Sequence, residues 1–108
     1  YTTIMVGGSF YFGYGSSTTA VSLGAANTDR HLFAGIADAS TAEGFIDGVS
    51  GWSIASSRGY SPQNGGIGSV NATTFWSGQI QEIIIYDSDQ SANRVAIETN
   101  INNQYDIY

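Results

Sequence analysis

The sequence contains no cysteine and no lysine, and each absence bears on a class of site. Without cysteine the chain can form no disulfide, no thiolate metal site and no cysteine nucleophile. Its fixed positive charges are Arg30, Arg58 and Arg94, and its formal net charge is −6. Nucleic acids and anionic membranes are bound through clustered Lys and Arg, so the sequence predicts neither as a partner. No apolar run approaches the length of a membrane span, so we expect no membrane insertion.

Charge and proline are also scarce, whereas glycine is abundant. Only 11% of the residues are charged and 42% are hydrophobic, so Ser, Thr, Asn, Gln and Gly must cover most of the surface. The single proline and 14 glycines are typical of short strands joined by tight turns. A chain of 108 residues forms one domain at most. The composition therefore predicts a single all-β domain rather than a helical bundle.

Two β-hairpins are predicted from local turn signals. Residues 1–14 (YTTIMVGGSFYFGY) contain two β-prone arms around a Gly-Gly turn. In residues 43–54 (EGFIDGVSGWSI), Asp47 and Gly48 separate two apolar arms. Asp-Gly suits a two-residue type I′ turn, because both central residues need positive φ. Further strands are predicted at residues 20–23 and 30–37.

The most distinctive stretch is residues 77–108, which begins with an apolar strand signal. Within residues 79–86 (QIQEIIIY), three consecutive isoleucines send side chains to both faces of a strand. This pattern predicts cover on both sides. If Ile84 is buried, its truncation to Ala should destabilise the fold by roughly 2 to 5 kcal/mol, and the same holds for Ile101.

A helix is predicted after an acidic turn at residues 87–90. Ser91 is a good N-cap for a helix over residues 92–104. Spacings of four, four and three predict one stripe that packs against the sheet. Its members are Ile97, Ile101, Tyr105 and Tyr108.

No catalytic constellation is apparent in the sequence. His31 is the single histidine, so a Ser-His-Asp triad would have to use it, but nothing near it resembles a nucleophile elbow. We interpret His31 as a strand or edge residue without chemistry. Glu43 and Asp47 lie close enough in sequence to suggest paired carboxylates, yet the turn accounts for Asp47. Glu82 is interpreted as a surface or hydrogen-bonded carboxylate.

Two stretches resemble a known family. Residues 75–87 (FWSGQIQEIIIYD), followed by Ser91 and residues 94–98 (RVAIE), resemble the C-terminal signature of LamG-like (concanavalin A-like lectin/glucanase) jelly-roll domains. Residues 45–49 (FIDGV) are similar to a hairpin of that family. The resemblance implies an all-β, two-sheet antiparallel jelly-roll sandwich with one short C-terminal helix, spanning residues 1–108. Family domains are longer, which implies that the first strands are missing or reduced and that the chain is a fragment of a longer protein.

The resemblance bears on chemistry as well. Enzymes of this family use a Glu-x-Asp-x-Glu strand motif, which this sequence lacks, so we expect no enzymatic activity. Some family members bind calcium through scattered aspartates, and no other cofactor is expected. The calcium candidates here are Asp29, Asp38 and Asp87, with solvated turn acids as the alternative interpretation.

The function expected from these features is that of a non-catalytic binding or adhesion module, directed to a glycan or surface polymer, on a virion or cell surface. Its candidate contacts are Trp52, Tyr60, Asn64 and Trp76, because aromatic faces stack on sugars and amides bind hydroxyls. The alternative places both tryptophans in the core.

A second hypothesis is a purely structural decoration, spike or fibre domain that mediates subunit contacts in a phage particle. Repeats of similar spacing occur in bacteriophage virion and tail proteins, and a surface poor in charge suits symmetric β assemblies. Its partners would be other virion or surface-protein subunits, including copies of the same chain. Both hypotheses predict an extracellular or virion-surface location.

Overall fold

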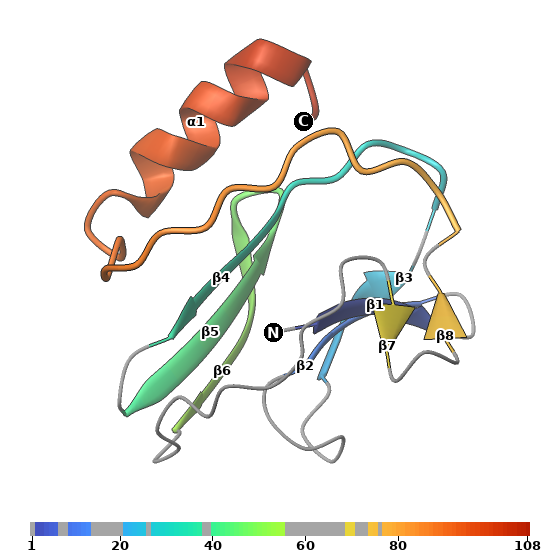
Figure 1. Cartoon of the computed structure of the whole chain (residues 1–108), viewed down its shortest axis with the longest axis horizontal. Helices are drawn as coiled ribbons and strands as arrows, with labels where there is room; N and C mark the ends of the chain where they lie inside the picture. Colours follow the sequence, from blue (N-terminus) through green and yellow to red (C-terminus); the bar gives the residue numbers. More distant parts are fainter. Residues whose placement is uncertain are drawn as a thin grey trace.

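The fold was analysed in a computed structural model. It describes residues 2–6, 9–13, 21–25, 27–37, 40–55, 69–70, 74–75 and 77–108. This part of the chain contains eight strands followed by one helix (Figure 1). The prediction of a mostly β chain with a single short helix near its C-terminal end is confirmed.

The first sheet is antiparallel with strand order β1-β2-β3. Its strands are β1 (Thr2–Val6), β2 (Ser9–Gly13) and β3 (Val21–Ala25). Val6 pairs with Ser9, so two residues connect β1 to β2, as the Gly-Gly signal predicts. A separate short pair, β7 (Ser69–Val70) with β8 (Thr74–Phe75), was not predicted.

The second sheet is an antiparallel meander with strand order β4-β5-β6. Its strands are β4 (Phe33–Ala37), β5 (Thr41–Ile46) and β6 (Val49–Ala55). Between β5 and β6, φ is 51° at Asp47 and 77° at Gly48. Both central residues are left-handed, which confirms the type I′ turn predicted from the Asp-Gly pair.

The buried apolar side chains of the described part lie in the second sheet. Ala42, Phe45 and Trp52 are at most 5% exposed. Trp52 on β6 is paired with Gly44 on β5, where the absence of a side chain leaves room beside the large indole. β3 of the first sheet lies against β6, so the two sheets meet there.

The strand predicted over residues 79–86 does not form. This segment is extended but belongs to no sheet in the described part of the chain. Ile83 and Ile84 are 49% and 44% exposed, and Ile85 is 85% exposed, so the predicted cover on both faces is wrong. An apolar run becomes a buried strand only where neighbouring strands supply backbone partners, and no described strand does so here.

The helix exists but begins later than predicted. α1 spans Arg94–Tyr105, and its N-cap is Asn93, not Ser91. Ser91 instead donates its backbone N–H to Asp89 Oδ1 (2.9 Å) and its hydroxyl to Asp89 Oδ2 (3.0 Å). This local turn competes with helix formation, as Asp and Ser side chains commonly do. Asp106 ends the helix in the left-handed conformation, and its N–H donates to the Asn102 carbonyl (2.7 Å).

The predicted apolar stripe of α1 is also corrected. Tyr108 lies beyond the helix, and the buried residue of α1 is Glu98. Ile97 and Ile101 line a hollow together with Ile84 and Tyr86 of segment 77–93, which runs alongside α1 in Figure 1. The contact between α1 and the second sheet is made by Arg94, whose guanidinium lies 3.9 Å from the centre of the Phe45 ring.

Candidate functional site

Asp47 extends the β4–β5 ladder by one residue through its side chain. The last strand pair is Phe33 with Ile46. Beyond it, the Asp47 backbone N–H donates to the Leu32 carbonyl (2.9 Å), and Asp47 Oδ1 accepts from the Leu32 N–H (2.9 Å). The left-handed turn takes the Asp47 carbonyl out of the ladder, and the carboxylate accepts in its place. Asp47 therefore does more than permit the turn.

His31 is held between Asp47 and Asn27. Its Nδ1 lies 2.7 Å from Asp47 Oδ2, and its Nε2 lies 2.7 Å from Asn27 Oδ1. The same Asn27 oxygen accepts the backbone N–H of Asp29 (2.7 Å). An aspartate on Nδ1 orients imidazoles in acid–base catalysis, but there Nε2 contacts a nucleophile. Here the described partner of Nε2 is an amide oxygen, an arrangement that ties two loop positions to the turn.

A buried ion pair lies on the sheet side of α1. Arg94 and Glu98, one helical turn apart, pair through Nη1 and Oε2, and the Glu98 side chain is 5% exposed. Glu98 Oε1 is buried without a hydrogen-bond partner among the described residues. Burial raises the pKa of Glu98, and the charge and hydrogen bond of Arg94 oppose that rise. The helix is thus attached to the sheet partly by charged groups.

Tyr108 completes this polar cluster from the C-terminal end. A Cβ atom at Gly48 would lie 3.1 Å from the Tyr108 hydroxyl, so the ring rests on the glycine of the turn. Partial burial raises the pKa of Tyr108, as do the negative charges of Glu98 and Asp47, while Arg94 lowers it. We call residues Asn27, His31, Asp47, Arg94, Glu98 and Tyr108 the turn cluster.

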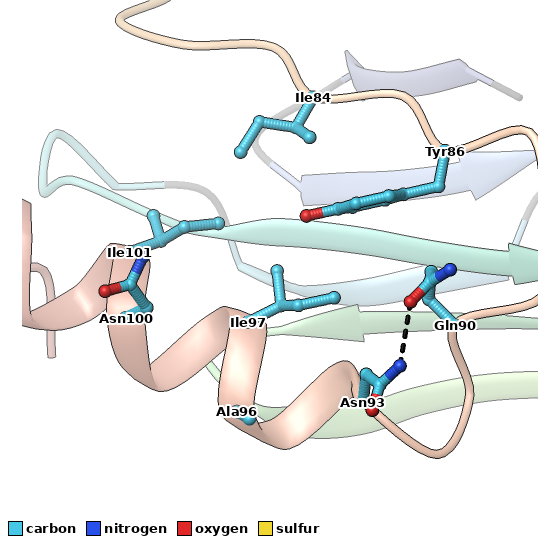
Figure 2. Close-up of a pocket in the computed structure, with 8 residues that line it drawn as sticks. All are labelled: Ile84, Tyr86, Gln90, Asn93, Ala96, Ile97, Asn100 and Ile101. Atoms are coloured by element: carbon cyan, nitrogen blue, oxygen red, sulfur yellow. Dashed lines mark hydrogen bonds between the residues drawn. The ribbon is translucent and has the colours of Figure 1, made fainter.

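An apolar hollow lies on the other side of α1. It has a volume of about 410 Å³, and Figure 2 shows Ile84 and Tyr86 pointing toward the helix across it. Ile97 and Ile101 line the helical wall. At one end Asn93 Nδ2 donates to Gln90 Oε1 (2.9 Å). The hollow is open and mainly apolar, so it suits contact with an apolar surface better than the orientation of a polar substrate.

The residues predicted to contact a glycan are only partly described. Trp52 is 5% exposed within the second sheet, so its ring face is not presented to a ligand. This placement agrees with the alternative that Trp52 belongs to the core. Tyr60, Asn64 and Trp76 lie outside the described residues, so a site built on them stays a prediction.

The described residues do not bring the calcium candidates together into a metal site. Asp29 and Asp87 are exposed, and Asp38 lies outside the described residues. The described ranges contain no group of three or more His, Asp or Glu side chains placed to hold a metal ion. Within the same ranges no helix could cross a bilayer: α1 has 12 residues, and about 20 are needed.

Comparison with known proteins adds no relative. No family model matches the chain, and neither the curated proteins nor the solved structures contain a match. The resemblance to LamG-like domains therefore rests on the sequence motifs alone.

Sequence reasoning missed most of the turn cluster. His31 and Asp47 are 16 residues apart, and nothing local to either predicts their contact. Glu98 occupies an i+4 position from Arg94, a spacing that signals an ion pair but not its burial. The apolar run of residues 83–86 contributes Ile84 and Tyr86 to the hollow, but its sequence predicts a covered strand rather than the wall of a hollow.

Proposed function

We propose that this chain is a non-catalytic interaction module that acts by contact with other protein subunits, in a virion or at a cell surface. The observation that carries the proposal is the exposed apolar run at residues 83–86. Ile85 is 85% exposed, and its neighbours Ile83, Ile84 and Tyr86 are 44% to 49% exposed. Contiguous exposed apolar side chains mark interaction surfaces in soluble proteins.

The proposal includes the finer fold assignment. We assign the sheets β1-β2-β3 and β4-β5-β6 to one jelly-roll sandwich of the LamG-like type, closed by α1. Their contact at β3 and β6, and the motif at residues 75–87, support this assignment. Jelly-roll domains of this kind present loops and edges for recognition and need no catalytic residues to do so.

A carbohydrate-directed form of the same function is the second candidate. It is favoured by the sequence of residues 57–70, where Tyr60 and Asn64 provide an aromatic face and an amide. Because Trp52 is buried, the stacking surface would have to come from Tyr60 and Trp76. The two candidates differ in their partner, a protein surface or a sugar, and one set of measurements separates them.

Sedimentation velocity of the purified chain, from about 1 to 100 µM, measures self-association over the affinity range of ordinary protein contacts. A glycan array and tryptophan fluorescence measure sugar binding in parallel. Multimers without sugar binding favour subunit contact, and a sugar-dependent fluorescence shift that disappears in Trp76→Ala favours the lectin-like candidate. A chain that stays monomeric and binds no sugar would contradict both.

A further inference from the structure

Segment 79–86 lies in no sheet of the described part of the chain, and its apolar side chains differ in how far they are exposed. Ile84 and Tyr86 point toward α1 across the hollow (Figure 2). Glu82 shares that face, because it lies close enough to the Tyr105 phenol at the end of the helix to raise the pKa of Tyr105, through hydrogen bonding first and its negative charge. Ile85, which lies between Ile84 and Tyr86, is 85% exposed, as expected for a side chain directed away from the helix in an extended segment. One face of segment 79–86 is thus partly covered by α1, and the other face is open.

The backbone of this segment has no partner in the described part of the chain. No backbone–backbone hydrogen bond between described residues involves residues 79–86. Isoleucine and tyrosine favour strands, so the conformation is suited to pairing. An extended apolar segment with unpaired N–H and C=O groups is a template for another strand.

We propose that a second copy of this chain pairs its own residues 81–87 with this segment, antiparallel, about a two-fold axis at Ile84. The proposal rests on the proposed function, since it names the partner of the subunit contact. An isologous pair requires a segment that is complementary to itself. The pairs would be Ile84 with Ile84, Ile83 with Ile85, Glu82 with Tyr86, and Gln81 with Asp87.

The register follows from the charges in the segment. With the axis at Ile84, the isoleucine triplet of one copy lies against the triplet of the other. A shift of one residue in one direction places Glu82 opposite Ile85, which buries a carboxylate against an alkyl group. A shift in the other direction places Glu82 opposite Asp87, a pair of like charges. The register with its axis at Ile84 avoids both penalties.

Charge complementarity also holds within the chosen register. Glu82 faces the hydroxyl of Tyr86, and Asp87 faces the amide of Gln81, so each carboxylate meets a neutral donor. The rest of the chain opposes association, because each copy carries a formal charge of −6. Added salt screens that repulsion. The dimer should therefore become tighter, not weaker, as ionic strength rises.

Cysteine substitutions test the register directly, because the chain has no cysteine of its own. Residues directly opposite on antiparallel strands have Cβ atoms about 4.5 to 5.5 Å apart, and diagonal neighbours about 7 to 8 Å. Disulfides need about 3.5 to 4.5 Å, so only opposite residues are near enough. Ile84→Cys alone should form a disulfide-linked dimer. Ile83→Cys and Ile85→Cys should each remain largely unlinked and should link to each other when mixed.

Two surface variants test the contact without a cross-link. Ile85→Lys changes a side chain that is 85% exposed, so the folded chain should tolerate it, and we expect dimer dissociation constants at least about tenfold higher in sedimentation. Val95→Lys is the matched control, because Val95 is 63% exposed on α1, outside the segment. Ser53→Cys, on an exposed position of β6, is the control for random cross-linking.

The outcomes separate this proposal from the broader one. If Ile85→Lys still forms multimers and Ile84→Cys forms no disulfide-linked dimer, the pairing of residues 81–87 is overturned. The subunit-contact function would still stand. A chain that stays monomeric at about 100 µM and is not linked overturns the self-pairing. Sugar binding by that monomer would then support the lectin-like candidate, whereas an inert monomer would contradict the proposed function as well.

Discussion

Replacing Asp47 tests how the turn cluster stabilises the second sheet. The Asp47 carboxylate accepts two hydrogen bonds, from the Leu32 N–H (2.9 Å) and from His31 Nδ1 (2.7 Å). Its φ of 51° adds a backbone requirement that is independent of both bonds. Three substitutions separate these contributions: Asp47→Asn, Asp47→Gly and Asp47→Ala.

The magnitudes follow from the geometry. A hydrogen bond to a charged group contributes about 1.5 to 3 kcal/mol, and we take the lower end because the Asp47 side chain is 25% exposed. Asp47→Gly loses both bonds without backbone strain, so the free energy of unfolding should fall by about 3 kcal/mol. Asp47→Ala should lose about 0.5 to 1 kcal/mol more, because alanine disfavours positive φ. Asp47→Asn keeps an acceptor and tolerates positive φ, so about 1 kcal/mol is expected.

Urea unfolding followed by tryptophan fluorescence provides the measurement, since Trp52 is buried in the same sheet. The expected order of stability is wild type, Asn, Gly and then Ala. Equal losses for all three variants would show that neither the bonds nor φ determine the effect. A stable Asp47→Ala variant would refute the claim that the carboxylate extends the ladder.

Three further predictions use the same assay. Burial raises the pKa of Glu98 above its ordinary value of 4.5, so its stabilising contribution is complete below about pH 4.5 and is lost as the pH rises through the raised pKa. The wild-type free energy of unfolding, measured relative to Glu98→Gln, should therefore fall as the pH rises from about 4.5 through the raised pKa, and a constant difference would contradict the burial of Glu98. Gly48→Ala should destabilise the fold by about 1 to 2 kcal/mol, because alanine disfavours the φ of 77° and its Cβ would lie 3.1 Å from the Tyr108 hydroxyl. Adding Tyr108→Ala should remove the steric contact but not the cost of the positive φ. Ile101→Ala should destabilise by about 1 kcal/mol, because Ile101 borders an open hollow rather than a closed core, and a loss of about 3 kcal/mol or more would show that the hollow is filled.

Local signals in the sequence predicted those features whose cause is also local. The turn at Asp47 and Gly48 forms as expected, because positive φ depends on the two residues themselves. The helix forms where the sequence predicts it, but it starts two residues later than predicted, since Ser91 has a nearby competing partner in Asp89. Such competition between a cap and an Asx turn depends on small energy differences.

Features that depend on distant residues were not predictable. The apolar residues of segment 79–86 were assigned to a buried strand, but pairing requires neighbours that a single stretch cannot reveal. Glu98 is buried because Arg94 lies over Phe45, a contact between residues 49 positions apart in the chain. Charged residues are expected at the surface by default, and the buried Arg94–Glu98 ion pair is an exception to that expectation.

The two-residue turn at Asp47 has a consequence for the order of folding. β4, β5 and β6 pair through residues close in sequence, and the Asp-Gly pair favours the turn conformation through its own local preferences. The loop-closure entropy of this meander is small, so we expect it to form early in folding. The contact between α1 and β5 closes a much longer loop, and we expect it to form late. Mutations in the turn should then slow folding, whereas mutations in the Arg94–Glu98 pair should mainly speed unfolding.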